Sequence, residues 1–385
     1  MLYRSLHSNT KMRNDLTSIL STVSDTNITR TTEDEKRNSI NAEYAEVLLP
    51  LTSFFCVLGL VGLVGNSLVL CVYGKGKQLK NKNYRRYIVC LALIDIVTCM
   101  SLIPAEVIKH RNYFSFEQDG LCKAKCFFNV FAAASASFCL LAIGFDRYCK
   151  VYYPLSKYKD LKSSSKIPWC ICVCSLLLGV LIAVPSAIMC GTDKSNMATS
   201  TGELTEVYLC GAALEYKYSI YRRVYRIGLC VLQAVLSIIM IAIYIRIGMK
   251  IKCHLRRISR GGNVPLDESD RINYYSSESK SRFASTNITL LCMVSLIYII
   301  TYGFYIALSF VNTINMKPIT FAFFSLFFRL YFVQSVINPL LYFKMDQDFR
   351  DSCRKIFCFG KKEKDGTSKR ISELFFSSPP QIVSL

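Results

Sequence analysis

Four charged residues lie inside or directly beside long apolar segments, where an ionised side chain is costly. Asp95 is the one charged residue in 87–105, and Arg329 is the one charged residue in 318–343. Asp146 and Arg147 stand side by side after 126–145, which contains no charged residue. An ionisable group in a membrane-like environment costs about 2.5–3.5 kcal/mol on insertion scales, so each is a candidate functional group. The chemistry open to them is ion binding, ligand binding or a charge pair that opens and closes.

The apolar segments themselves are long enough to cross a lipid bilayer, which takes about 20 helical residues. They lack the polar face that recurs every 3.6 residues in the helices of soluble proteins. The sequence therefore predicts an all-α membrane protein, with a bundle of seven transmembrane helices in residues 47–343. The expected spans lie near 47–74, 87–108, 123–147, 167–190, 222–247, 284–312 and 318–343.

The distribution of positive charge predicts the orientation of the chain, whose net charge is +20. The loops after the first, third and fifth spans hold six, six and nine Lys or Arg, and the residues after the seventh span hold nine. The alternate loops hold one or two each. Because positive loops stay in the cytoplasm, we expect a multi-pass plasma-membrane protein with an extracellular amino terminus. This placement of charge argues against nucleic-acid binding and favours attraction to anionic membrane lipid.

The segments that flank the spans have distinct compositions. Residues 1–46 are polar and predict an extracellular disordered tail, with a glycosylation sequon at Asn27. The loop 190–220 alternates around 207–210, which is consistent with a hairpin. Residues 344–358 predict a short amphipathic eighth helix on the membrane surface, where Cys353 and Cys358 would face lipid as candidates for palmitoylation. Residues 359–385 predict a cytoplasmic disordered tail that contains serine.

Seven motifs occur in order along these segments. They are Gly65-Asn66, the stretch LALID that ends at Asp95, Cys122, Asp146-Arg147-Tyr148, Trp169, Asn338-Pro339 followed by Tyr342, and Phe349-Arg350. In this combination the chain resembles the rhodopsin-like (class A) G protein-coupled receptors over about 50–358. The resemblance implies an extracellular ligand, a heterotrimeric G protein as partner, and arrestin as a further partner of the serine-containing tail.

The resemblance also implies roles for particular residues. Arg147 is held by Asp146 at rest and is freed to face a G protein when the helices part, together with Tyr148, Tyr244 and Tyr342. A disulfide joins Cys122 to Cys210, with Cys190 as the alternative partner.

A polar cluster is implied in mid-membrane, and in the family this cluster holds a sodium ion. Its members here are Asn66, Asp95, Ser335 and Asn338, with Ala136 where the family usually has a serine ligand. Pro339 removes a helix hydrogen bond and provides a hinge. The chain departs from the family in the sixth span, where 301–304 read TYGF without the usual Trp and Pro. It departs again in the fifth span, where Leu236 replaces the usual Pro.

Several ligand classes are excluded by single residues. Residues 318–343 contain no lysine for a retinal Schiff base, and Asn129 stands where amine receptors place an acid. The remaining features resemble a neuropeptide receptor, with a pocket lined by Glu106, Asn129, Arg226, Tyr302, Tyr305 and Arg329. Glu106 and Arg329 have similar expected depths on neighbouring helices and could form a charge pair; alternatively, Arg329 extends to the interface and Glu106 faces water.

Two other functional classes were weighed against a signalling receptor. The missing Trp and Pro favour, as the alternative, a seven-helix receptor that binds ligand without activating a G protein. A channel, transporter or enzyme is disfavoured, because the three histidines His7, His110 and His254 are too scattered to build a metal or catalytic centre. We expect no enzymatic activity and no cofactor apart from the sodium ion.

Overall fold

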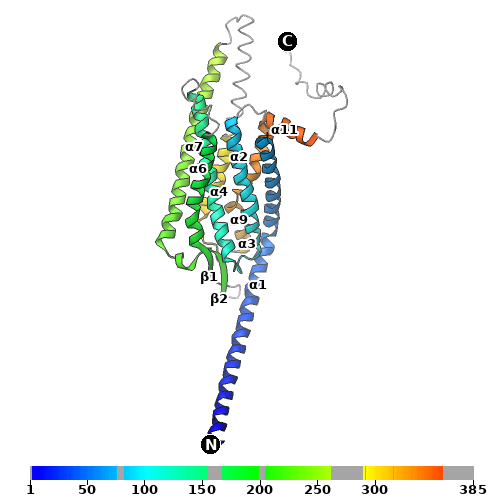
Figure 1. Ribbon diagram of the computed structural model, residues 1–385, viewed down its shortest axis with the longest axis vertical. Helices are drawn as coiled ribbons and strands as arrows, with labels where there is room; N and C mark the ends of the chain where they lie inside the picture. Colours follow the sequence, from blue (N-terminus) through cyan, green and yellow to red (C-terminus); the bar gives the residue numbers. More distant parts are fainter. Residues whose placement is uncertain are drawn as a thin grey trace.

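The computed structural model describes residues 2–75, 82–153, 167–198, 204–261, 289–290, 292–314 and 316–358. It is a bundle of long helices with a two-stranded hairpin at one end (Figure 1). The long helices are α1 (Leu2–Lys75), α2 (Lys82–Val97), α4 (Asp119–Tyr152), α6 (Ile167–Met189) and α7 (Ile220–Gly261). The later ones are Cys292–Leu308, α9 (Pro318–Phe328), α10 (Phe332–Met345) and α11 (Gln347–Cys358).

The apolar helices correspond to the expected membrane spans. Within the described ranges, five are long and apolar enough to cross a bilayer: Thr32–Gly74, Arg85–Arg111, Asp119–Tyr152, Ile167–Met189 and Ile220–Cys253. Helices α9 and α10 make a sixth when they are taken together, and they are bent by 44° at the residues between them. The shorter apolar helix Cys292–Leu308 lies in the expected sixth span, 284–312. Each of the seven expected spans is therefore matched by an apolar helix.

The second span changes its helical geometry half-way along. A π-helical turn, η1 (Thr98–Leu102), joins α2 to α3 (Ile103–Arg111). Pro104 is the second residue of α3 and cannot donate a hydrogen bond to the preceding turn. A π turn inserts one residue into the helical repeat, so it rotates the face of α3 that carries Glu106.

The loop after α6 folds into the antiparallel hairpin β1 (Cys190–Ala198) and β2 (Leu204–Ala212). Two disulfides attach it to α4, Cys122–Cys210 and Cys126–Cys190. The first is the predicted bond, and Cys190 pairs with Cys126 rather than competing for Cys122. We call this the disulfide end of the bundle, and the opposite end, where α4 carries Arg147, the Arg147 end.

Peptide mapping without reduction should recover Cys122 linked to Cys210 and Cys126 linked to Cys190, with the reduced sample as the control. Replacing Cys122 with Ser should destabilise the protein by about 2–4 kcal/mol, because a bridge across a long loop restricts the unfolded chain. The loss is measurable as a lower thermal unfolding midpoint in detergent. A free Cys122 thiol, or a Cys122–Cys190 peptide, in the unreduced protein would contradict this pairing.

The amino-terminal segment differs from the disordered tail expected over 1–46. Helix α1 begins at Leu2 and continues past the disulfide end, beside the hairpin (Figure 1). The last turns before the bundle are held by contacts: Asn41 donates to the carbonyl of Arg111, and the hydroxyl of Tyr44 donates to the carbonyl of Met316. Tyr44 also packs edge-on against Phe114, with ring centroids 4.7 Å apart. These contacts could not be predicted from the polar composition of the segment, because the partner residues lie far away in the chain.

Helix α11 follows α10 at the Arg147 end, as the amphipathic pattern predicts. The expectation that Cys353 faces lipid is wrong, because its side chain is 2% exposed and belongs to the buried core. The same face carries Phe349, whose ring stacks on Tyr73 of α1 at 5.4 Å. Tyr73 also donates to Asp346 at 2.5 Å. These contacts turn the Phe349–Cys353 face towards α1 rather than outwards.

Helix α4 lies in the middle of the bundle and packs against α2, α6 and α7. It packs tightly on α6 at Gly179, where an added Cβ would lie 2.0 Å from the Ser135 hydroxyl and 3.2 Å from the Phe131 carbonyl. Only glycine fits there, which is the usual way in which membrane helices pack closely.

Candidate functional site

A cavity of about 350 Å³ lies at the disulfide end, walled on one side by the hairpin. Lys109 of α3, Asn129 of α4, Arg222 and Arg226 of α7, and Arg329 contribute polar groups to its wall. Aromatic side chains complete it, among them Tyr113, Tyr305, Phe321, Phe324 and Phe328. Tyr113 is outside the membrane spans and bonds Thr313 across the cavity rim at 3.0 Å. Burial raises the pKa of the Tyr113 phenol, so it stays protonated at neutral pH.

A second chamber of about 110 Å³ adjoins the first between α4, α7 and Cys292–Leu308. The two chambers share Asn129, Arg226 and Tyr305. Asn129 donates to the Tyr305 hydroxyl at 2.7 Å, so two of the predicted pocket residues meet where the chambers join. The inner chamber is lined mainly by apolar groups, including Val130, Ala133, Leu229 and Leu236. This mainly apolar lining suits an apolar or aromatic side chain.

The inner chamber ends on a hydrogen-bond network that joins three helices. The Tyr298 hydroxyl contacts Ser137 of α4 and lies 3.2 Å from the Gln233 amide oxygen of α7. Tyr298 also donates to the Ala133 carbonyl at 2.9 Å. Both Ser137 and Gln233 line the chamber. A group entering the chamber therefore touches the residues that link the three helices.

Glu106 and Arg329 are both buried and form the charge pair that their depths suggested. The Arg329 Nε donates to Glu106 Oε1, and its Nη2 contacts the same oxygen. The other carboxylate oxygen of Glu106 lies 2.6 Å from Lys125 Nζ. His110 Nε2 is 3.8 Å from Oε1. Glu106 thus links α3 to α4 and to the bend between α9 and α10, and Lys125 is a partner that sequence reasoning missed.

Arg329 lies at the bend between α9 and α10, within a span that the sequence predicts as continuous. Its own N–H is shared between the carbonyls of Ser325 and Leu326, and Phe332 donates to the Arg329 carbonyl at 3.0 Å. The bonds to the Leu326 and Arg329 carbonyls are the tighter i→i+3 bonds of a 3₁₀ turn. Arg329 is ten residues before Pro339, and helix α10 continues through Pro339. The bend in this span therefore lies at Arg329, and the hinge at Pro339 stays a prediction.

The four residues expected to form the mid-membrane polar cluster are in contact. Asp95 accepts hydrogen bonds from Ser335 at 2.8 Å and from Asn338 at 2.9 Å. Asn66 donates to the Ser335 carbonyl at 2.7 Å. The amide oxygens of Asn66 and Asn338 are buried and have no donor among the described residues. Together with the Asp95 carboxylate they are oxygen ligands of the kind that suits a hard cation.

At the Arg147 end, Asp146 and Arg147 are both buried, with the Arg147 Nε 4.0 Å from Asp146 Oδ2. Lys150, one turn further along α4, contacts the same carboxylate oxygen. The Tyr148 ring stacks on Tyr152 at 4.5 Å. Asp146 therefore serves two cations, of which sequence reasoning considered only Arg147.

The two tyrosines expected near Arg147 lie on different helices. Tyr244 of α7 accepts from Ser295 at 3.0 Å, and its hydroxyl approaches Gly144 of α4. Tyr342 of α10 is buried against Tyr73 and Phe349, with ring centroids 6.2 and 6.4 Å away. Tyr342 thus packs towards α1 and α11, and a move towards Arg147 would require α10 to shift.

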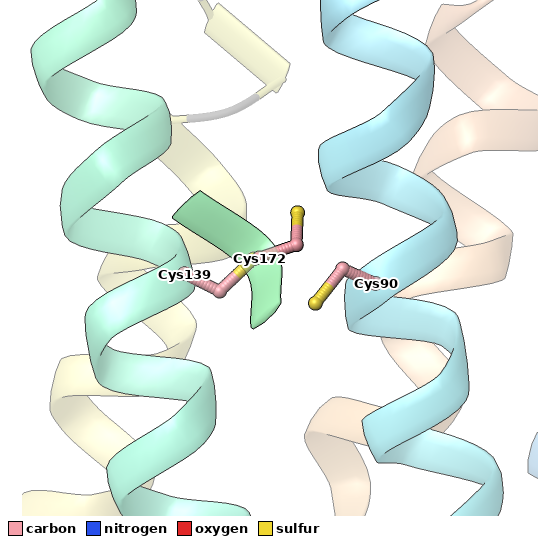
Figure 2. Close-up of side chains that lie close together, drawn as sticks. All are labelled: Cys90, Cys139 and Cys172. Atoms are coloured by element: carbon pink, nitrogen blue, oxygen red, sulfur yellow. The ribbon is translucent and has the colours of Figure 1, made fainter. Parts of the chain in front are cut away.

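Three cysteines form the one group of described His, Cys, Asp and Glu side chains with donor atoms close enough for a common metal ion (Figure 2). Cys90, Cys139 and Cys172 come from α2, α4 and α6, are buried, and have Sγ atoms within 4.8 Å of one another. Cys139 and Cys172 donate weakly to backbone carbonyls, at 3.8 and 3.9 Å. Three thiolates would bring net negative charge into an apolar interior, whereas neutral thiols pack well there. We therefore interpret the cluster as packed thiols.

Comparison with known proteins gives the family of this chain. A family model described as "7 transmembrane receptor (rhodopsin family)" matches residues 65–342, which is most of the chain. The chain belongs to the rhodopsin family of seven-transmembrane receptors. It is a receptor rather than an enzyme, and a multi-pass membrane protein.

The receptor is similar to several individual family members. It is 23% identical to the RYamide receptor of Tribolium castaneum over 304 residues, which are 78% of each chain. It is 23% identical to bombesin receptor subtype-3 of Ovis aries over 368 residues, 91% of this chain and 86% of that one. It is 24% identical to the histamine H2 receptor of Homo sapiens over 327 residues, 80% of each chain. These relatives include receptors for both peptides and an amine.

The sixth span lacks the family's Trp, and an aromatic cluster of tyrosines lies in this part of the receptor instead. Tyr298 and Tyr302 have ring centroids 4.5 Å apart, and Tyr302 stacks on Tyr331 at 5.2 Å. This stack links Cys292–Leu308 to the bend between α9 and α10. The sequence contains the tyrosines at helical spacing, but periodicity alone cannot distinguish such a link from ordinary core packing.

Replacing Tyr298 with Phe should raise signalling in the absence of ligand by about fivefold. The change removes the hydroxyl that joins Cys292–Leu308 to α4 and α7, and a hydrogen bond of this kind contributes about 1 kcal/mol. Ligand-free G-protein activation, normalised to surface expression, measures the effect. Tyr302→Phe is the matched control, because no hydrogen bond of its hydroxyl is found in the described chain. Equal basal signalling of the two variants would contradict the role given to Tyr298.

Proposed function

We propose that this receptor binds an extracellular peptide at the disulfide end and activates a heterotrimeric G protein at the Arg147 end. The observation that carries the proposal is the two-part cavity beneath the hairpin, whose inner chamber ends on the Tyr298 network. A peptide has both the size for the outer chamber and side chains for the inner one. Asn129 lines the cavity where an amine receptor would need an acid, which favours a peptide over an amine.

The orientation in the plasma membrane follows from the same proposal. The loops rich in Lys and Arg flank the Arg147 end, and positive loops stay in the cytoplasm. We therefore assign the amino terminus and the hairpin to the extracellular side. Disulfides form in that oxidising compartment, and both bridges lie at the disulfide end.

The proposal extends to an ion and to further partners. Asp95, Asn66 and Asn338 would hold a sodium ion, which would supply a positive charge beside the Asp95 carboxylate. Ala136 contributes no oxygen ligand, so the set is smaller than the family's.

Arrestin would bind the serine-containing tail 359–385, which lies outside the described residues, and anionic lipid would contact α11. Glycosylation of Asn27 and palmitoylation of Cys358 stay predictions, because the side chains of both residues lie outside the described part; Cys353 is too buried for acylation in this conformation.

The test is a peptide library applied to cells that co-express the receptor and a promiscuous G protein. We expect at least one peptide to produce a G-protein signal that untransfected cells do not give. The same cells expressing Arg147→Ala should bind the active peptide without signalling.

The competing function is ligand binding without coupling, which the missing Trp and Pro of the sixth and fifth spans favour. In that case a labelled peptide would bind saturably to the cells, yet neither the native receptor nor any variant would activate a G protein. That pair of results would overturn the coupling half of the proposal.

A further inference from the structure

The wall of the outer chamber is positively charged on several sides. Lys109, Arg222, Arg226 and Arg329 line it from α3, α7 and the α9–α10 bend, and no Asp or Glu is among the described residues that line it. Lys109 donates to the Cys210 carbonyl at 3.4 Å, and Arg226 donates to the Ser309 carbonyl. Both cations therefore bond neutral groups, and neither bond cancels a charge.

The nearest carboxylates are already occupied by other cations. Glu106 is 1% exposed, and its two oxygens contact Arg329 and Lys125. Lys109 interacts with the same carboxylate over a longer distance. Asp193, an acid that interacts electrostatically with Arg222, lies 2.5 Å from Lys217. A cationic ligand would therefore meet several cations and no available carboxylate.

The charge balance around Glu106 is uneven. Three basic side chains, Arg329, Lys125 and Lys109, surround one carboxylate, and in the described chain neither lysine forms an ion pair with a second acid. Uncompensated charge in a poorly hydrated site is costly. An anion in the outer chamber would offset that cost, and two or more guanidinium or ammonium groups could bond to it. Charge-assisted bonds of this kind are stronger than bonds between neutral groups.

The inner chamber adds a second requirement for the ligand. Arg226 lines both chambers, so an anion bound at Arg226 lies next to the entrance of the inner one. Beyond Arg226 the inner chamber is lined mainly by apolar side chains, including Val130, Ala133, Leu229 and Leu236, and they favour an apolar group over a charged one. The ligand group that enters it must be apolar and adjacent to the anion.

We propose that the ligand carries a carboxylate that binds between Lys109, Arg226 and Arg329, next to an apolar side chain that enters the inner chamber. This inference rests on the proposed function and gives the chemical class of the peptide: an acidic side chain or a free carboxyl terminus beside an apolar or aromatic residue. It excludes basic peptides and amines, although an amine receptor is among the relatives of this chain.

Three dipeptides that differ in one side chain test the inference. They are acetyl-Phe-Glu-amide, its uncharged isostere acetyl-Phe-Gln-amide and the basic acetyl-Phe-Lys-amide. Thermal unfolding of the purified full-length receptor, in buffer without phosphate or free carboxylates, reports binding because a ligand that binds the folded state raises the midpoint. We expect the Glu peptide to raise the midpoint at concentrations at least about tenfold lower than those the Gln peptide requires. The Gln side chain cannot form the charge-assisted hydrogen bonds that the Glu carboxylate makes. The Lys peptide should have no effect.

Variants locate the binding charge. Lys109→Gln and Arg226→Gln should each weaken the Glu peptide by about tenfold and leave the Gln peptide unchanged. The control is Lys123→Gln, because Lys123 is exposed and pairs with Asp119 at 2.6 Å outside the cavity. Two separate variants keep the test decisive if one of them fails to fold. Three results would overturn the inference. The three peptides could stabilise the receptor equally, none of them could stabilise it, or both variants could bind the Glu peptide as tightly as the native receptor does.

The readout separates this inference from the proposed function. Thermal stabilisation does not involve a G protein, so Glu-selective binding without any signalling would overturn only the coupling proposal. Conversely, G-protein activation by a neutral or basic peptide through this cavity would overturn the anionic ligand and leave the proposed function standing.

Discussion

Arg147→Ala is expected to abolish ligand-dependent G-protein activation while surface expression and ligand binding stay close to those of the native receptor. Arg147 lies at the end of α4, buried beside Asp146, and far along the helix from the cavity at the disulfide end. Its guanidinium would be the group exposed to a G protein when the helices part. The measurement is G-protein activation against peptide concentration, with cell-surface labelling and peptide binding recorded on the same cells.

The neighbouring acid should have the opposite effect. Asp146→Asn removes the charge that holds Arg147, so ligand-free signalling should rise several-fold. Lys150→Gln is the matched control: it removes the other cation on the Asp146 carboxylate and leaves the Asp146–Arg147 pair in place. It should not raise basal signalling to the level of Asp146→Asn. Normal ligand-dependent signalling by Arg147→Ala would mean that the receptor couples by another route.

The seven spans and the Asp95 cluster could be predicted because both follow from position along single helices. Charge-free stretches of about 20 residues mark the spans, and the depth of Asp95 matches that of Asn66 and Asn338 on neighbouring helices. Direct contacts of Asp95 with Ser335 and Asn338 are what that depth implies. The Cys122–Cys210 bond was predicted in a different way, from the resemblance to the rhodopsin-like receptors, with Cys190 as the alternative partner.

Other features depend on contacts that no single segment contains. The amino-terminal extension of α1 is anchored by Asn41 and Tyr44, whose partners are 70 and 272 residues away. Cys353 faces the bundle because Phe349 stacks on Tyr73 of α1, and an amphipathic pattern shows that a helix has an apolar face without showing what covers it. The bend at Arg329 contains no Pro or Gly, so nothing in its sequence signals a break. Lys125 was visible as a cation, but not as a partner of Glu106.

Glu106→Arg and Arg329→Glu are each expected to reduce surface expression or ligand potency severely. Removing one partner of a buried charge pair costs about 3–5 kcal/mol, a large part of the total stability of a typical domain. Glu106→Arg is the worse case, because it would place a fourth cation among Arg329, Lys125 and Lys109. Arg329→Glu would bring two carboxylates together, although Lys125 lies 2.6 Å from one of them and would remain as a partner.

The double variant, with both charges exchanged, should recover part of what the single variants lose. The exchanged pair restores one attractive contact between α3 and the α9–α10 bend, but the new Arg would still face Lys125, which bonded the original carboxylate. Recovery should therefore be incomplete, and replacing Lys125 with Gln in the exchanged background should increase it. The coupling is measured from the surface expression and the thermal unfolding midpoints of the native receptor, the two single variants and the double variant. A pairwise interaction appears as non-additivity of the single effects. If the double variant is no better than the worse single variant, the Glu106–Arg329 contact does not hold the two helices together.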